Sequence, residues 1–232
     1  MNIEADRPIP GRHNMYHAIH RGLRYGHAQM LRRLGATDFT DQTEAEVAIA
    51  DLRGFLRLAE GHMASEETVI HPAAEAAEAG STSHAHEGHD DHEQSFADLD
   101  RLITAVETAV GSDRALRGDA LYRRYARFVA ADIAHMDEEE GPLLGLMQRL
   151  FTDDELRGIE GRVVSGISPD KMMGYMRLIL PALPAPDRLR MLKEMQAGMP
   201  PIVFQVVLTD AALILLSASE FAAVAHGLAG TA

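Results

Sequence analysis

The sequence predicts an all-α fold: a four-helix bundle of up-down-up-down topology followed by a C-terminal helical subdomain. Two observations support this prediction. The helix-forming residues alanine, leucine, methionine, glutamate and arginine dominate, while aromatic residues make up 5% and tryptophan is absent. Four long amphipathic segments with short connections also precede a series of shorter ones. We therefore divide the 232-residue chain into a bundle at 1–150 and a helical extension at 151–232.

The first two long segments carry recognisable helix signals. The first covers residues 13–34 and is predicted to end at Gly35, because glycine favours helix C-termini. The second is predicted to begin at Thr43, with Glu46 three residues on in a capping-box pattern. It is predicted to end near Pro72 or at the segment Glu78–Gly80.

The next two segments complete the predicted bundle. Small polar residues at 79–88 indicate a loop, and a third helix follows over about 89–110. A turn at 111–113 leads into the fourth helix, 114–150. Pro142 lies inside that segment, so a kink or break is expected there.

The C-terminal extension begins with a second capping-box pattern, from Thr152 to Glu155. Prolines and serines then divide it into short helices. This part contains one histidine, His226, and no spacing typical of metal ligands. We therefore expect the extension to lie outside any metal site.

Charge and composition exclude several classes of function. A formal net charge of −13 and a pI near 5.3 argue against binding to nucleic acid or to anionic membranes. The absence of cysteine excludes disulfides, thiolate zinc sites and iron–sulfur clusters. No signal peptide and no apolar run of the ~20 residues that span a membrane are present, so a cytoplasmic location is expected.

Two His-x-x-x-Glu pairs are the main functional signal: His62 with Glu66, and His135 with Glu139. Residues four apart share one face of a helix, so each pair can hold one metal ion. Two pairs on facing helices can hold two ions with the carboxylates bridging them, as in di-iron bundle proteins. Imidazole and carboxylate ligands suit iron. Glu67 and Glu138, which adjoin the paired glutamates, are expected either to support the ligands or to face solvent.

The other two long helices supply further imidazoles. The candidates are His13, His17, His20, His27, His84, His86, His89 and His92. One His-x-x-x-Glu pair alone is usually a solvated ion pair, but histidines on every helix favour a metal site. The segment around 84–93 is alternatively a flexible metal-scavenging tract. His71 and His226 are expected to be ordinary helix-end or surface residues.

Four motifs carry a resemblance to a known family: IHRGLR around His20, GHMASEETVIHP, DHEQSFADL around His92, and AHMDEEEGPLL. Over residues 13–150 the chain resembles the hemerythrin-like HHE cation-binding proteins. The stretch from FTDDELRGI to ILPALPAPDR resembles a C-terminal extension of some bacterial members. The resemblance implies an oxo- or hydroxo-bridged centre of two iron ions. The implied ligands are His20, His62, Glu66, His92, His135 and Glu139.

The chain departs from the oxygen-carrying hemerythrins on its third helix, where those proteins have a His-x-x-x-His pair. Here Glu93 stands four residues after His89, and Phe96 four after His92. A fifth imidazole would have to come from His89 or His17. A set of four histidines and two glutamates leaves an open coordination position. We therefore expect a protein that binds or responds to dioxygen, nitric oxide, peroxide or iron status.

Two other functions are compatible with the sequence. One is a di-iron enzyme that turns over peroxide or nitric oxide, and the other is a structural helical bundle with incidental surface histidines. The expected partner is a small diatomic ligand or peroxide, with no nucleic acid and no membrane. The sequence identifies no protein partner and no catalytic residue apart from the metal ligands.

Overall fold

The computed structural model describes residues 7–230, except for the side chains of residues 83–87 and 90. Every regular element of this part is a helix, which confirms the all-α class. None of its helices is both long and apolar enough to cross a membrane. The chain forms two compact units: residues up to Tyr16 with Gly26–Gly166, and His17–Tyr25 with Ile167–Ala232.

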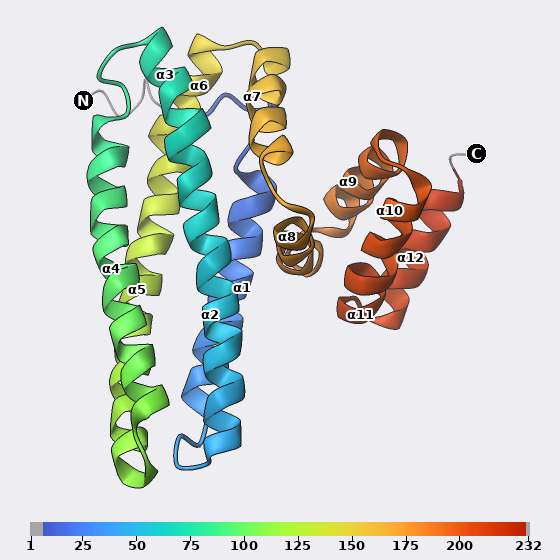
Figure 1. Ribbon diagram of the computed structural model, residues 1–232. Helices are drawn as coiled ribbons and strands as arrows, with labels where there is room; N and C mark the ends of the chain where they lie inside the picture. Colours follow the sequence, from blue (N-terminus) through green and yellow to red (C-terminus); the bar gives the residue numbers. More distant parts are fainter. Residues whose placement is uncertain (1–6, 231–232) are drawn as a thin grey trace. The chain divides into compact units, whose positions relative to one another are not determined.

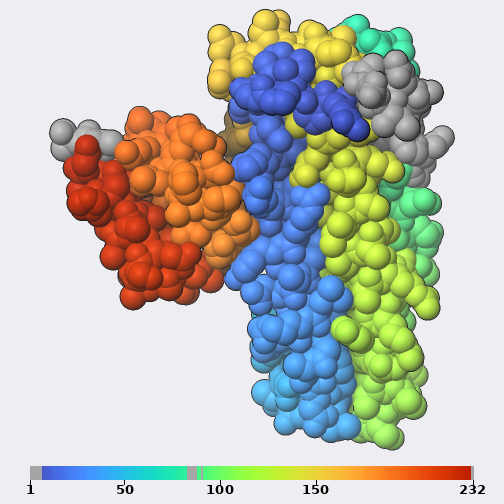
Figure 2. Space-filling view, turned by 180° about the vertical axis from the view of Figure 1, so that it is seen from behind, coloured from blue at the N-terminus to red at the C-terminus, as the bar shows by residue number. Residues whose placement is uncertain are grey.

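The first unit is built on long helices: α2 (Gln42–Ser65), α4 (Ser83–Thr108), α5 (Gly111–Glu138) and the second half of α1 (His17–Ala36). The helices α2, α4 and α5 lie side by side (Figure 1). Helices α4 and α5 pack against each other, and Figure 2 shows part of α4 beside α5. Buried apolar side chains fill the interior, among them Leu34, Leu52, Leu99, Ile103, Leu121 and Phe128.

Two helix ends near the first connection differ from the prediction. Gly35 is inside α1, where a Cβ atom would lie 3.3 Å from the Cε2 atom of Tyr122. The contact there is close, and the predicted C-cap is wrong because α1 continues to Ala36 with Thr37 as its C-cap. The predicted cap at Thr43 is also wrong, because Asp41 precedes α2 and accepts a 2.9 Å hydrogen bond from the Glu44 amide.

The second connection is shorter than predicted. Helix α4 begins at Ser83, so only the first part of the expected 79–88 loop is irregular. The side chains of His84 and His86 lie outside the described residues. The predicted turn at Gly111 is instead the first residue of α5, where a φ of 54° requires glycine.

Helices α2 and α5 each continue through a π-turn. The first, η1 (Glu66–Ile70), leads into α3 (His71–Ala77), and the second, η2 (Glu139–Leu143), leads into α6 (Leu144–Leu150). In each case the residue after the π-turn donates its amide to the glutamate five residues earlier. Pro142 lies inside η2, where its missing N–H falls in an already irregular ladder, so the helix continues and does not break.

The helix α7 (Asp153–Ser165) has the predicted capping box: the Glu155 carboxylate accepts from the Thr152 amide at 2.7 Å. Its buried residues Leu156 and Ile159 join an apolar cluster that also contains Met15, Tyr16, Ile70, Ala74, Leu143, Leu144 and Met147. Helix α7 therefore belongs to the first unit, which extends beyond residue 150 to Gly166.

The second unit contains α8 (Pro169–Ala182), α9 (Ala185–Gly198), α10 (Pro201–Val207), η3 (Leu208–Ala212), α11 (Leu213–Leu215) and α12 (Ala218–Ala229). Proline begins or nearly begins α8, α9 and α10, as the sequence indicates. The buried Arg188 side chain donates to the carbonyls of Leu180 and Leu183 and pairs with Glu220 at 3.1 Å. This arginine ties α8, α9 and α12 together.

Candidate metal centre

The two His-x-x-x-Glu pairs lie at the ends of α2 and α5, and each glutamate is the first residue of a π-turn. His62 Nε2 is 3.1 Å from Glu66 Oε1, and His135 Nε2 is 3.3 Å from Glu139 Oε1. Both carboxylates are buried, with exposures of 1% for Glu66 and 2% for Glu139. Two buried carboxylates in one interior are costly unless a cation accompanies them.

His89 of α4 points between these two carboxylates. Its Nε2 atom lies 3.7 Å from Glu66 Oε2 and 3.8 Å from Glu139 Oε1. Ligand atoms of Glu66, His89, His135 and Glu139 all lie within 4.8 Å of one another. The structure therefore brings together donors from three helices.

The geometry of this group fits a shared metal ion better than hydrogen bonds. The Nε2 atoms of His89 and His135 are buried and have no hydrogen-bond partner in the described part of the chain. Two ligands bound to one ion at about 2.1 Å are ~3.0 Å apart at 90° and ~3.6 Å apart at 120°. The 3.3 Å separation of His135 and Glu139 lies within this range, and the 3.7 and 3.8 Å separations of His89 from the two carboxylates lie slightly above it. A set of nitrogen and oxygen donors suits first-row transition metals.

The electrostatic field of the site favours a cation. Burial alone lowers the pKa of His89, but the carboxylates of Glu139, Glu66 and Glu67 outweigh it and raise the pKa to about 9. Burial raises the pKa of the Tyr16 phenol well above its ordinary value, and Glu139 and Glu66 raise it further. In the metal-free protein the carboxylates therefore favour the protonated form of His89.

Gly88 allows α4 to pass close to the ring of His135. A Cβ atom at this position would lie 2.9 Å from His135 Nδ1, well inside van der Waals contact. The Gly88 carbonyl also accepts a 2.7 Å hydrogen bond from His92 Nδ1. The sequence places Gly88 in a predicted loop, so its role in packing is visible only in the structure.

His92, a predicted ligand, faces a different partner. Its Nε2 atom is 3.0 Å from Asp132 Oδ1, and Asp132 Oδ2 is 2.7 Å from His27 Nε2. The other His27 nitrogen bonds the Tyr125 hydroxyl at 3.0 Å. Although burial raises it, the pKa of Asp132 falls below its usual range because of His27 and His92. In this structure His89, and not His92, directs a ring nitrogen at Glu66 and Glu139.

His71 is completely buried, and the expectation that it is an ordinary helix-end or surface residue is wrong. Its ring stacks on His89, with 4.9 Å between centroids and 22° between planes. An α-helix turns ~100° per residue, which would put His71 ~140° around the helix from Glu66. The π-turn instead places His71 about one turn after Glu66 along the helix, because five residues complete roughly one turn there. The sequence periodicity carries no signal for this shift.

The remaining predicted histidines have varied surroundings. His20 is fully buried on α1 and lies two turns before His27 on the same helix face. His13 pairs with Glu160 at 2.8 Å, and the His17 ring nitrogen is 3.1 Å from Asp187. His17, the second possible fifth imidazole, thus has a carboxylate partner in its own unit. As expected, His226 is exposed.

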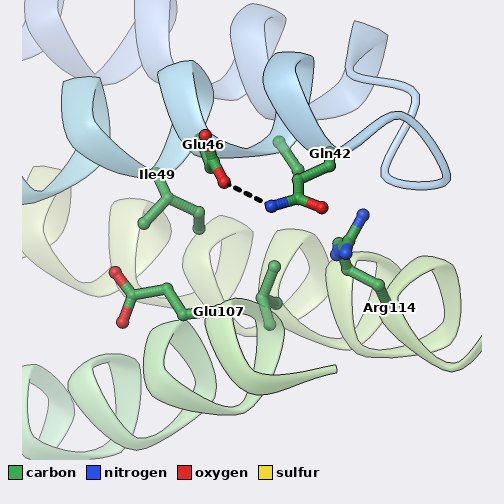
Figure 3. A pocket seen from close by; sticks show the side chains of 7 residues that line it. Gln42, Glu46, Ile49, Glu107 and Arg114 are labelled. Atoms are coloured by element: carbon green, nitrogen blue, oxygen red, sulfur yellow. Dashed lines mark hydrogen bonds between the residues drawn. The ribbon is translucent and has the colours of Figure 1, made fainter. Parts of the chain in front are cut away.

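A pocket near the start of α2 is not an alternative metal site (Figure 3). Its lining residues are Gln42, Ala45, Glu46, Ile49, Val106, Glu107 and Arg114. Gln42 donates to Glu46 at 2.8 Å, and Arg53 donates two hydrogen bonds to Glu107. The pocket has no histidine, and both of its carboxylates already have partners.

Comparison of the chain with models of protein families, with curated proteins and with solved structures finds no match. Function is therefore inferred from the geometry of the site.

Proposed function

We propose that this chain is a hemerythrin-like non-heme di-iron protein that binds or responds to dioxygen, nitric oxide, peroxide or iron status. The helices α1, α2, α4 and α5 would form its up-down-up-down four-helix bundle. One observation carries the proposal: the ligand atoms of Glu66, His89, His135 and Glu139 converge in a buried group.

The residues divide naturally between two iron ions. Glu66 and Glu139 are the proposed bridging ligands, because each carboxylate faces His89 as well as the histidine of its own pair. His89 and His135 would bind one ion, and His62 the other. We propose His20 as a further ligand of the second ion from its sequence motif and its complete burial on α1. The sequence-based assignment of His92 stays a prediction.

When bound, the iron pair supplies a redox centre with open coordination positions for a small ligand. The protein supplies the surroundings. The carboxylates of Glu66 and Glu139 balance the metal charge, and the apolar cluster containing Tyr16, Ile70 and Leu143 keeps bulk water from that end of the unit. The raised pKa of Tyr16, due to burial and then to Glu139 and Glu66, keeps its proton on the phenol.

Iron content tests this proposal directly. Protein isolated from iron-replete cells should carry about two iron ions per chain and show near-ultraviolet charge-transfer absorption. The variants Glu66→Ala and Glu139→Ala should lose most of the metal, while the exposed control Asp137→Asn should retain it. One zinc ion per chain, with no uptake of iron by the apoprotein, would contradict the proposal.

Tyr16 favours a second candidate function, an enzyme that turns over peroxide or nitric oxide. Its buried phenol is within electrostatic reach of Glu139 and Glu66 and keeps its proton, so it can donate a hydrogen bond at the site. Iron-loaded protein with excess reductant should then consume many equivalents of peroxide or nitric oxide, and Tyr16→Phe should slow that turnover while retaining the iron. Stoichiometric binding without turnover would favour the binding function.

A further inference from the structure

The two π-turns are equivalent in position but not in sequence. The residue five after Glu66 is His71, and the residue five after Glu139 is Leu144. Both are fully buried, with exposures of 0% and 1%. A buried imidazole where the equivalent position has an apolar side chain needs a compensating interaction.

That interaction lies at Nδ1 of His89, the ring nitrogen opposite the one that faces Glu66 and Glu139. Glu67 Oε1 is 2.5 Å from His89 Nδ1 and 3.5 Å from His71 Nδ1. The His71 ring lies nearly parallel to the His89 ring. His89 therefore has Glu66 and Glu139 at one ring nitrogen and Glu67 at the other, with His71 against its face.

A separate metal ion between Glu67, His71 and His89 does not fit these distances, although their ligand atoms lie within 4.8 Å of one another. Two atoms that share an ion with bonds of about 2.1 Å are ~3.0 Å apart even at 90°. The 2.5 Å separation of Glu67 and His89 is too short for that arrangement and is a hydrogen bond.

We propose that Glu67 and His71 are positioning residues for His89, an inference that rests on the proposed metal centre. His89 donates its Nδ1 proton to Glu67, which directs the Nε2 lone pair toward Glu66 and Glu139. His71 fixes the plane of the ring by stacking on it. A carboxylate that accepts the second proton of a metal-binding imidazole orients the ring and increases its basicity.

Zinc titration of the apoprotein tests the role of Glu67. The variant Glu67→Ala should bind zinc ~10–100-fold more weakly than the wild type. The amide oxygen of Glu67→Gln can still accept the hydrogen bond from His89 Nδ1, so this variant should recover part of the lost zinc affinity. The exposed control Asp137→Asn should bind like the wild type. If Glu67→Ala does not fold, the zinc affinity of Glu67→Gln relative to that of the wild type tests the role of Glu67.

His71→Leu tests the stacking contact, because it copies the residue at the equivalent position after Glu139. Leucine preserves the buried apolar volume, and we expect weaker zinc binding without loss of helix content. Unchanged zinc affinity in this variant would remove His71 from the proposal.

A spectroscopic measurement separates positioning from a purely structural role. In zinc-loaded protein labelled with ¹⁵N-histidine, His89, assigned by its loss in His89→Ala, should show a proton on Nδ1 and zinc on Nε2. Glu67→Ala should shift or broaden the Nδ1–H signal. A wild type that binds zinc or iron while Glu67→Ala is unchanged in both affinity and spectrum would overturn this inference alone. A wild type that binds neither metal would overturn the proposed function.

Discussion

His89 and His92 show how one turn of helix separates two chemical roles. His89 Nε2 lies between Glu66 and Glu139, whereas His92 is held by Asp132 and the Gly88 carbonyl. His92 remains the ligand that the family resemblance implies, but its ring in this structure serves the buried network around Asp132. Substitution of each histidine distinguishes the two roles.

We expect His89→Ala to lose more iron than His92→Ala, because only the first substitution removes a nitrogen aimed at the carboxylates. His92→Ala instead leaves Asp132 buried with one partner fewer, so its main effect should be a loss of stability of about 1–3 kcal/mol. Iron content and urea unfolding of the two variants measure these effects. Full iron content in His89→Ala, with loss in His92→Ala, would restore the sequence-based ligand set.

Gly88 offers a test that separates helix formation from metal binding. Alanine is favoured over glycine inside a helix by about 1 kcal/mol, so Gly88→Ala should not lower helix content. Its Cβ atom would meet the ring of His135 at 2.9 Å and push that ligand out of place. Metal affinity should therefore fall.

The matched control for this substitution is Gly158→Ala, since a Cβ atom there meets nothing within 4 Å. Metal titration and circular dichroism of both variants give the comparison. Equal metal affinity in the two variants would mean that His135 adjusts without cost or does not bind the ion.

At the level of helices, the sequence predicts the site where helical spacing is regular and fails where it changes. The four-residue spacing of His62 and Glu66 lies within an α-helical turn, so the pair was predictable. His71 follows a π-turn, and no periodicity in the sequence marks the inserted residue. Because the helix was expected to start at residue 89 and α4 in fact starts at Ser83, the sequence indicated His89 only as a possible fifth imidazole.

Capping was predictable to different degrees. The boxes at Thr152 and Ser217 each have a hydroxyl and a glutamate three residues on, and both form as that pattern indicates. The same pattern at Thr43 failed because Asp41, two residues earlier, is also a strong cap and starts the helix first. Local patterns thus identify a helix start to within a turn but do not choose between competing caps.

The capping box of α12 leads to a prediction about pH. Hydrogen bonds from Ser217, and then from Arg188, lower the pKa of Glu220 to about 2, whereas an unfolded glutamate has a pKa of about 4.3. A lowered folded pKa gives stability that is complete above the unfolded value and is lost as the pH falls toward 2. The wild type should therefore be more stable than Glu220→Gln at pH 7, and the difference should shrink below about pH 4.3.

Urea unfolding of the two proteins between pH 7 and pH 2.5 checks this dependence. Glutamine retains most of the capping geometry, so the comparison isolates the charge. A difference in the free energy of unfolding that is constant over this range would show that the carboxylate charge does not contribute.

At the scale of the whole molecule, the proposed metal centre would couple function to stability. The first unit buries Glu66 and Glu139 in one interior, where their carboxylates favour protonation of His89 when no ion is bound. Such an arrangement weakens the metal-free protein, because buried charges are costly when incompletely paired. The free energy of metal binding must therefore appear as free energy of folding.

We accordingly expect bound metal to raise the thermal stability of the chain. At a free metal concentration of 100 times Kd, the stabilisation is about 2.7 kcal/mol. For a protein of this size, that corresponds to an increase in Tm of roughly 5–11 °C. Calorimetry of the apoprotein with and without Fe(II) under anaerobic conditions, or with Zn(II), measures the shift.

Glu139→Gln is the matched variant for this measurement, because it removes one buried charge with little change in shape. Its metal-free form should be at least as stable as the wild-type apoprotein, since one carboxylate no longer has to be balanced. Added metal should raise its Tm by much less, since the proposed bridge is gone. A variant that is less stable without metal, yet shifts as far as the wild type when metal is added, would show that Glu139 serves the fold and not the ion.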